Sequence, residues 1–377
     1  MGAHERKTES GGAHVKRTVL VAGASGLVGY AVMEHYAAQP DTEVIAVSRR
    51  KPDQTFGAQF VSADLTNEQG CAALFGTMGH VTHLVYAALY EKPGLLLGWL
   101  EDDQIETNGR MLRNLFEPLS KAAQGLRHVS LLQGTKAYGA HVRQIDVPAR
   151  PNRSEERATR NFYWVQEDYL RAKQSGADWG LTIFRPQIIF GFSLGSAMNL
   201  IPAIGAYAAL LKEAGKPLSF PGGAPLVLEA IDADVLAHAI AWAGESEVAR
   251  PQIYNVTNGD VFVWHNVWPV IADALGMEVG PPAPLRVGHA MESRGADWER
   301  IRNKYGLVAP ALKAFVGESF HYLDFTMAYG LDQVVGLAPI VSTITLRRDG
   351  FHEVMDTEDM LRKWFRIYQD QHLLPPP

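Results

Sequence analysis

Three glycines directly after an apolar segment place the strongest constraint on how this chain folds. Residues 18–22 have the composition of a buried strand, and residues 30–38 are typical of a helix. Between them, one glycine permits a tight turn, one lets the backbone approach a pyrophosphate, and one lets the helix pack closely on a sheet. The helix N-terminus offers free N–H groups and a positive dipole end. This segment predicts a dinucleotide-binding turn, whose expected contacts are Gly23, Ser25, Gly26, Leu27, Val28 and Gly29.

Composition narrows the class of protein. The chain has 377 residues, 47% of them hydrophobic and 20% charged, with a net charge of −6. These values are typical of a globular enzyme and give no indication of a nucleic-acid partner. No apolar run reaches the ~18 residues that cross a bilayer, so no membrane association is expected. The single cysteine, Cys71, excludes an intrachain disulfide and favours a cytoplasmic location. Residues 1–16 are polar and are expected to form a disordered tail.

Strand-like and helix-like segments alternate along most of the chain. This alternation predicts an α/β fold, a doubly wound parallel sheet of the Rossmann type with a smaller, mostly helical C-terminal substrate lobe. Residues 17–190 are expected to bind the dinucleotide, with 231–258 returning to the same domain. Residues 191–230 and 259–377 would form the substrate-binding lobe, and 191–225 resemble an inserted lid because glycine, proline and small apolar residues dominate there. The expected strands cover residues 18–22, 43–47, 58–62, 81–86, 126–132, 181–184 and 252–256, and 231–243 are expected to be helical.

The end of the second strand distinguishes NAD from NADP. An acidic residue there binds a ribose 2′-hydroxyl, whereas cations accommodate a 2′-phosphate. This chain has Ser48, Arg49 and Arg50 and no carboxylate, so NADPH is the expected cofactor, although a solvated basic turn would look the same. After the third strand, Asp64 and Leu65 suit the adenine edge. After the fourth, Ala87 and Ala88 are small enough for the cofactor to pass closely.

The residues expected to carry the chemistry follow the fifth strand. Reductases of the extended short-chain dehydrogenase/reductase superfamily, which the chain resembles, use a Tyr-x-x-x-Lys pair for proton transfer to a carbonyl. Here Tyr163 is followed four residues later by Glu167, which argues against ordinary alcohol dehydrogenase or epimerase chemistry. A lysine, Lys136, instead lies in the turn after the fifth strand.

Together these features resemble the atypical branch named for progesterone 5β-reductase and iridoid synthase. Its hallmarks are a Gly-x-Lys-x-Tyr turn, present as Gly134 to Tyr138, and an Asn-Phe-Tyr-Tyr/Trp-x-x-Glu-Asp helix start, present as Asn161 to Asp168. The similarity extends from about residue 17 to the C-terminus. Further matching stretches begin at Asn108, Arg185, Met198, Asn258 and Phe320.

The resemblance implies NADPH-dependent 1,4-reduction of an activated C=C bond in a small hydrophobic enone or enal. Charge that develops on the carbonyl oxygen would be stabilised by a hydroxyl donor, here Tyr163, assisted by Lys136. Gln133, Tyr163, Pro186, Ile188 and Ile189 are the further expected cofactor contacts. The expected substrate pocket comprises Trp99, Tyr138, Phe192, Met198 and Phe320, together with Tyr329 or its neighbours.

Other functions stay open from the sequence. A carbonyl reductase, a nucleotide-sugar epimerase or dehydratase, and a non-catalytic NADPH sensor would all carry the glycine turn. The 13 histidines show no metal-ligand spacing, so no metal is expected. Oligomeric state is likewise open, with a homodimer as one option.

Overall fold

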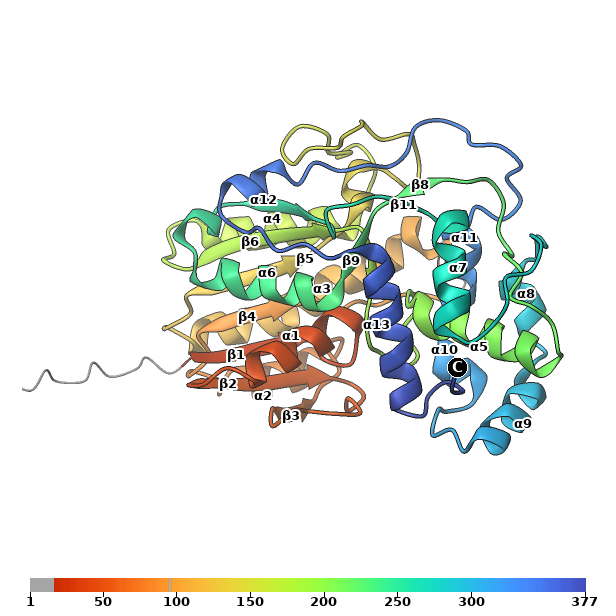
Figure 1. The fold of residues 1–377 in the computed structure, drawn as a ribbon. Helices are drawn as coiled ribbons and strands as arrows, with labels where there is room; N and C mark the ends of the chain where they lie inside the picture. Colours follow the sequence, from red (N-terminus) through yellow and green to blue (C-terminus); the bar gives the residue numbers. More distant parts are fainter. Residues whose placement is uncertain (1–16, 94, 96) are drawn as a thin grey trace, which may run out of the picture.

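The computed structural model describes residues 17–377 apart from 94 and 96 (Figure 1). The expected tail at 1–16 therefore lies outside the described residues. A seven-stranded sheet in the order β10-β6-β5-β4-β1-β2-β3 forms the centre of the fold, and all its neighbouring strands are parallel. This arrangement confirms the predicted doubly wound sheet. Its strands are β1 (Arg17–Ala22), β2 (Thr42–Ser48), β3 (Gln59–Ser62), β4 (His83–Tyr86), β5 (His128–Leu132), β6 (Gly180–Pro186) and β10 (Ile253–Val256).

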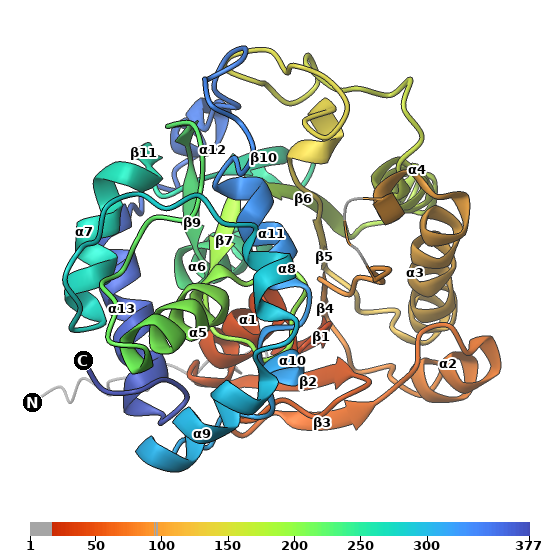
Figure 2. The same cartoon turned by 90° about the vertical axis from the view of Figure 1, so that its right-hand side faces the viewer.

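Helices cover both faces of this sheet, as Figure 2 shows. Parallel strands buried on both faces need such a cover, and β1, β4 and β6 are accordingly almost wholly buried. On one face lie α2 (Glu68–Phe75), α3 (Asp102–Ala122) and α4 (Phe162–Gln174). On the other lie α1 (Leu27–Ala37) and α6 (Ala233–Glu245).

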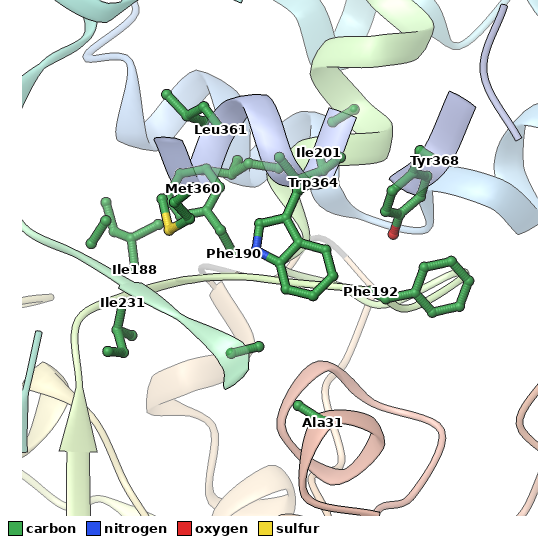
Figure 3. Close-up of a cluster of buried hydrophobic side chains, with 14 of the residues drawn as sticks. Ala31, Ile188, Phe190, Phe192, Ile201, Ile231, Met360, Leu361, Trp364 and Tyr368 are labelled. Carbon is green, nitrogen blue, oxygen red and sulfur yellow. The ribbon is translucent and has the colours of Figure 1, made fainter. Parts of the chain in front are cut away.

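The second lobe is mostly helical and shares a continuous hydrophobic core with the α1 and α6 face of the sheet. Figure 3 shows this junction, where Trp364 and Tyr368 lie near Phe190 and Phe192. Two small two-stranded sheets lie next to this core. In one, β7 (Ile188–Phe190) pairs with β9 (Ala230–Asp232), and in the other β8 (Val227–Leu228) pairs with β11 (Phe262–Val263). The helices of the second lobe are α5 (Leu200–Glu213), α7 (Trp264–Ala274), α8 (Val287–Met291), α9 (Gly295–Tyr305), α10 (Leu312–Val316), α11 (Ser319–Thr326) and α13 (Thr357–Asp370). The short α12 (Ile344–Arg348) packs instead against β10 at the edge of the large sheet (Figure 1).

Two details differ from the sequence-based expectation. Residues 191–225 contain a helix of 14 residues, α5, rather than only lid-like structure. Its first eleven residues are all buried, so it has no polar face whose periodicity would mark it as helical. Ile231 and Asp232, expected at the start of a helix, instead belong to β9, because Ile231 pairs with Ile189 of β7.

Within the described part of the chain, no helix is both long enough and apolar enough to span a membrane.

Candidate active site

A cavity of about 910 Å³ runs from the glycine turn along the carboxyl ends of the strands to α11. It opens beside β1, where chain order reverses, because β1 pairs with β2 on one side and with β4 on the other. Ligands of doubly wound folds bind at such a reversal. The cavity therefore lies where a dinucleotide is expected.

The glycine turn is built as tightly as its sequence suggests. Gly23 has a φ of +89°, and a Cβ there would lie 2.7 Å from the carbonyl carbon of Ala87. A Cβ on Gly29 would lie 2.2 Å from the Gly23 oxygen, so the helix backbone packs directly on the turn. Gly26 is less crowded, since its Cβ would come no closer than 3.4 Å to the Gly23 oxygen. As the N-cap of α1, Gly26 provides no side-chain cap, so the N-terminus of α1 keeps backbone donors for an anion.

Cations lie at the end of β2, beside the same cavity. Arg49 and Arg50 both line it and are exposed. Their backbone is held in place because Ser48 Oγ donates to the Arg50 carbonyl at 2.6 Å and Ser62 Oγ donates to the Arg49 carbonyl at 3.2 Å. The Arg50 guanidinium also donates to the carbonyl of Leu194, so it connects this turn to the second lobe.

The carboxylate of Asp64 accepts two hydrogen bonds from Thr66. Its Oδ1 accepts hydrogen bonds from the Thr66 N–H at 2.9 Å and from the Thr66 hydroxyl at 2.7 Å. These bonds hold the pKa of Asp64 below its usual value, so the group is ionised at neutral pH. Asp64, Leu65, Ala87 and Ala88 all line the cavity.

Tyr163 lies at the start of α4, which is fixed to the turn that carries Lys136. Asn161 caps the helix by accepting from the Tyr163 N–H at 3.0 Å, and its amide donates to the Lys136 carbonyl at 3.4 Å. A Cβ on Gly134 would lie 3.1 Å from the Tyr163 hydroxyl, so the glycine leaves room for that hydroxyl. The Tyr163 hydroxyl forms no hydrogen bond with any residue in the described ranges and is not sealed within the core. It therefore faces the cavity as an unpaired donor.

Glu167, which stands where the usual lysine is expected, belongs to a buried hydrogen-bond and ion-pair network. Its carboxylate accepts from Gln133 Nε2 at 3.0 Å, from Arg157 and from Arg171, and it pairs with the fully buried Arg185 at 3.5 Å. The Gln133 oxygen in turn accepts from Arg185 Nε at 2.8 Å. Gln133 lines the cavity, but its side-chain amide serves this buried network, which fixes α4 against the sheet.

Lys136 lies over an aromatic ring. Its Nζ is 3.7 Å from the centroid of the Trp99 ring, and it makes no hydrogen bond or ion pair with the residues that the structure describes. Burial lowers the pKa of Lys136 to about 8, an effect that the nearby Glu91 carboxylate opposes. Burial also raises the pKa of Glu91, which accepts from Trp99 Nε1 at 3.1 Å and from Gln104 at 3.1 Å. The ammonium is thus desolvated and close to a carboxylate, and it titrates near physiological pH.

Most of the residues singled out by sequence line this cavity together, although five do not. Gly29 packs behind the turn, and Phe192 and Phe320 are core residues. Tyr138 is fully buried and donates to Asn255 Oδ1 at 2.6 Å, while Tyr329 is 40% exposed. The residues that do line it are Gly23, Ser25, Gly26, Leu27, Val28, Ser48, Arg49, Arg50, Asp64, Leu65, Ala87, Ala88, Trp99, Gln133, Lys136, Tyr163, Pro186, Ile188, Ile189 and Met198.

Several cavity residues were missed by sequence reasoning. Glu91 and His141 lie beside Lys136, and Tyr322 and Phe325 approach from α11. Of these four, only Tyr322 and Phe325 could have been suspected from the sequence, since they lie within or next to the family-matching stretch that begins at Phe320. That stretch identified the segment but not the side chains that face the cavity.

Comparison with known proteins assigns the family. Residues 77–364 match the model of the PRISE-like Rossmann-fold domain. The chain belongs to this PRISE-like family. It is 33% identical over 313 residues to an (S)-8-oxocitronellyl enol synthase of Nepeta racemosa, with 76% of each chain covered. It is also 32% identical over 278 residues to a 3-oxo-Δ(4,5)-steroid 5β-reductase of Arabidopsis thaliana, with 69% of each chain covered.

Solved structures agree on the fold of this PRISE-like protein. A UDP-glucose 4-epimerase of Thermus thermophilus, solved with NAD, has a TM-score of 0.63 at 18% identity, covering 93% of this chain and 99% of that one. An epimerase of Methanothermobacter thermautotrophicus has a TM-score of 0.65 at 13% identity, covering 94% and 92%. At these identities the similarity concerns the fold alone.

Proposed function

We propose that this protein is an NADPH-dependent reductase that carries out 1,4-reduction of small hydrophobic enones or enals and so saturates their activated C=C bond. The observation that carries the proposal is that one cavity, which begins at a dinucleotide-binding turn, contains both Tyr163 and the desolvated Lys136 ammonium, and that the Tyr163 hydroxyl has no hydrogen-bond partner among the described residues. The Arabidopsis relative bears the name of a steroid enone reductase, which supports the same chemistry.

The residues present fit NADPH. Gly23 and Gly29 occupy positions where any Cβ would collide with backbone, as a close-packed phosphate turn requires. The donors at the N-terminus of α1 suit the pyrophosphate, and Ser48, Arg49 and Arg50 suit a 2′-phosphate. Pro186, Ile188 and Ile189 would lie along the nicotinamide. When bound, NADPH supplies the hydride that the β-carbon of the substrate receives.

The protein residues act on the carbonyl end of the substrate. Burial raises the pKa of Tyr163, so its hydroxyl stays protonated and can donate a hydrogen bond to the carbonyl oxygen. This bond strengthens as negative charge develops on that oxygen, so it stabilises the transition state more than the ground state. Lys136 adds a positive charge in a site of low dielectric. Solvent can then protonate the α-carbon, and no acidic side chain is required there.

The proposal also includes the domains, pocket walls, location and oligomeric state expected from the sequence. Residues 17–190 and 231–258 would hold the cofactor, and 191–230 and 259–377 would enclose the substrate. Of the pocket residues expected from the sequence, Trp99 and Met198 line the cavity and would contact the substrate. The partner is a small hydrophobic molecule, the expected location is the cytoplasm, and the protein could act as a homodimer.

Consumption of NADPH with 2-cyclohexen-1-one tests the proposal. Wild-type protein should oxidise NADPH and yield the saturated ketone, with the carbonyl intact. Tyr163→Phe should lower kcat by about 100- to 1,000-fold, the usual effect of removing one donor to a developing oxyanion. Tyr329→Phe, which alters an exposed tyrosine outside the cavity, is the matched control. An allylic alcohol as product, or full turnover by Tyr163→Phe, would contradict the proposal.

A further inference from the structure

Tyr322 is one of three tyrosines that line the cavity, together with Tyr90 and Tyr163. It lies on α11 of the second lobe and lines the cavity, to which Tyr163 of α4 also contributes. Its hydroxyl forms no hydrogen bond with the residues described for this chain, and it is not among the polar atoms sealed in the interior. The hydroxyl is therefore accessible and, in a residue that lines the cavity, available to donate to a bound ligand.

The ring of Tyr322 is held by its neighbours. It stacks on Phe325 with centroids 6.4 Å apart, and Phe325 meets the Trp99 ring edge-on at 6.2 Å. Helix α11 is itself anchored, because Asp324 accepts the backbone N–H groups of Val287 and Gly288 at 2.7 and 2.9 Å. A donor on a ring fixed in this way needs little reorganisation when a ligand binds.

Electrostatics connects the two tyrosines. Burial is the largest cause of the raised pKa of Tyr163, followed by the Glu91 carboxylate and the nearby Tyr322 hydroxyl, and burial raises the pKa of Tyr322 itself. Both hydroxyls are therefore protonated at neutral pH and available as donors. A carbonyl oxygen has two lone pairs and can accept one hydrogen bond from each.

We propose that the Tyr322 hydroxyl donates a second hydrogen bond to the carbonyl oxygen of the substrate, opposite the bond from Tyr163. This inference rests on the proposed enone reduction. Two donors from different lobes would assemble on one oxygen only when substrate is bound. The arrangement selects substrates whose activating group is an exposed carbonyl oxygen.

The variant Tyr322→Phe keeps the ring and its stacking while it removes only the hydroxyl. With 2-cyclohexen-1-one and NADPH, we expect kcat to fall by about 10- to 100-fold with little change in KM, because the bond strengthens in the transition state. Tyr329→Phe is again the matched control, and thermal unfolding should be the same for all three proteins. Unchanged kcat in Tyr322→Phe, or a change in KM alone, would overturn the second-donor role.

A binding measurement separates this inference from the proposed function. Para-substituted phenols of graded acidity mimic an enolate oxygen, and their affinity for the NADP⁺-loaded protein should rise with acidity more steeply in wild type than in Tyr322→Phe. Equal slopes would overturn the second donor. If wild-type protein does not reduce cyclohexenone at all, the proposed function fails. If it does so and Tyr322→Phe matches it, only the present inference fails.

Discussion

Replacing Lys136 with methionine should stabilise the protein while it abolishes the proposed activity. Burial lowers the pKa of this ammonium from its usual 10.5 to about 8. At 1.36 kcal/mol per unit, the charged form costs about 3 kcal/mol at neutral pH. The contact between Nζ and the Trp99 ring, 3.7 Å from its centroid, offsets about 1 kcal/mol of that cost. The expected gain for Lys136→Met is therefore about 2 kcal/mol.

The gain in stability from Lys136→Met should shrink as pH rises. Native Lys136 loses its proton near pH 8, whereas the same side chain in the unfolded chain loses it near 10.5. Between these values the unfolded state binds more protons, so the contribution of Lys136 to wild-type stability becomes less unfavourable as pH rises. The advantage of Lys136→Met should be complete below pH 8 and absent by about pH 10.5.

Urea unfolding at pH 7 and pH 10 measures this difference. At pH 7 the thermal midpoint of the variant should also rise by about 2–3 °C, since a chain of 377 residues has a large unfolding entropy. Lys121→Met, at an exposed lysine of α3, is the matched control and should change neither midpoint appreciably. A variant less stable than wild type at pH 7, or a difference independent of pH, would refute the assigned desolvation of Lys136.

Two further predictions concern the cofactor and acid stability. Replacing Arg49 and Arg50 together with alanine should raise KM for NADPH by at least about 100-fold and leave KM for NADH nearly unchanged, because two charge-assisted bonds to a 2′-phosphate contribute about 1.5–3 kcal/mol each. Equal effects on both cofactors would contradict the assignment. His83 and His128 are buried beside each other, with pKa values lowered by desolvation to about 4 and about 3. These two histidines should therefore lower stability by about 4 kcal/mol between pH 7 and pH 5, where the unfolded imidazoles take up protons that the native ones do not. Urea titrations of wild type and His83→Gln/His128→Gln test this, and a double variant with the same acid sensitivity would exclude the pair as its cause.

The sheet could be predicted because its signals are local. Each buried parallel strand is a short apolar run, and the observed strands lie at or within a few residues of the predicted ones. The turn at Gly23 is equally local, since the tight approach of Gly29 to Gly23 lies within seven residues of chain. Helix α5 was missed because burial on every side removes the polar face that reveals a helix.

The pocket walls could be predicted only in part. Phe320 and Tyr322 are two positions apart on α11, and a rotation of 100° per residue places them on nearly opposite faces. Phe320 joins the core and Tyr322 lines the cavity. A motif that marks the segment does not reveal this choice, because it depends on how α11 packs against α5 and α8.

The sequence by itself determined the dinucleotide turn, the doubly wound sheet and the displacement of lysine from α4 to the turn at Lys136. Each of these depends on residues adjacent along the chain. Only the tertiary structure decided that Glu167 binds Arg185, that Lys136 lies over Trp99, and that Tyr322 lines the cavity. Those contacts join residues that are not adjacent in sequence, and burial, which lowers the pKa of Lys136 and raises that of Tyr322, exists only in the folded chain.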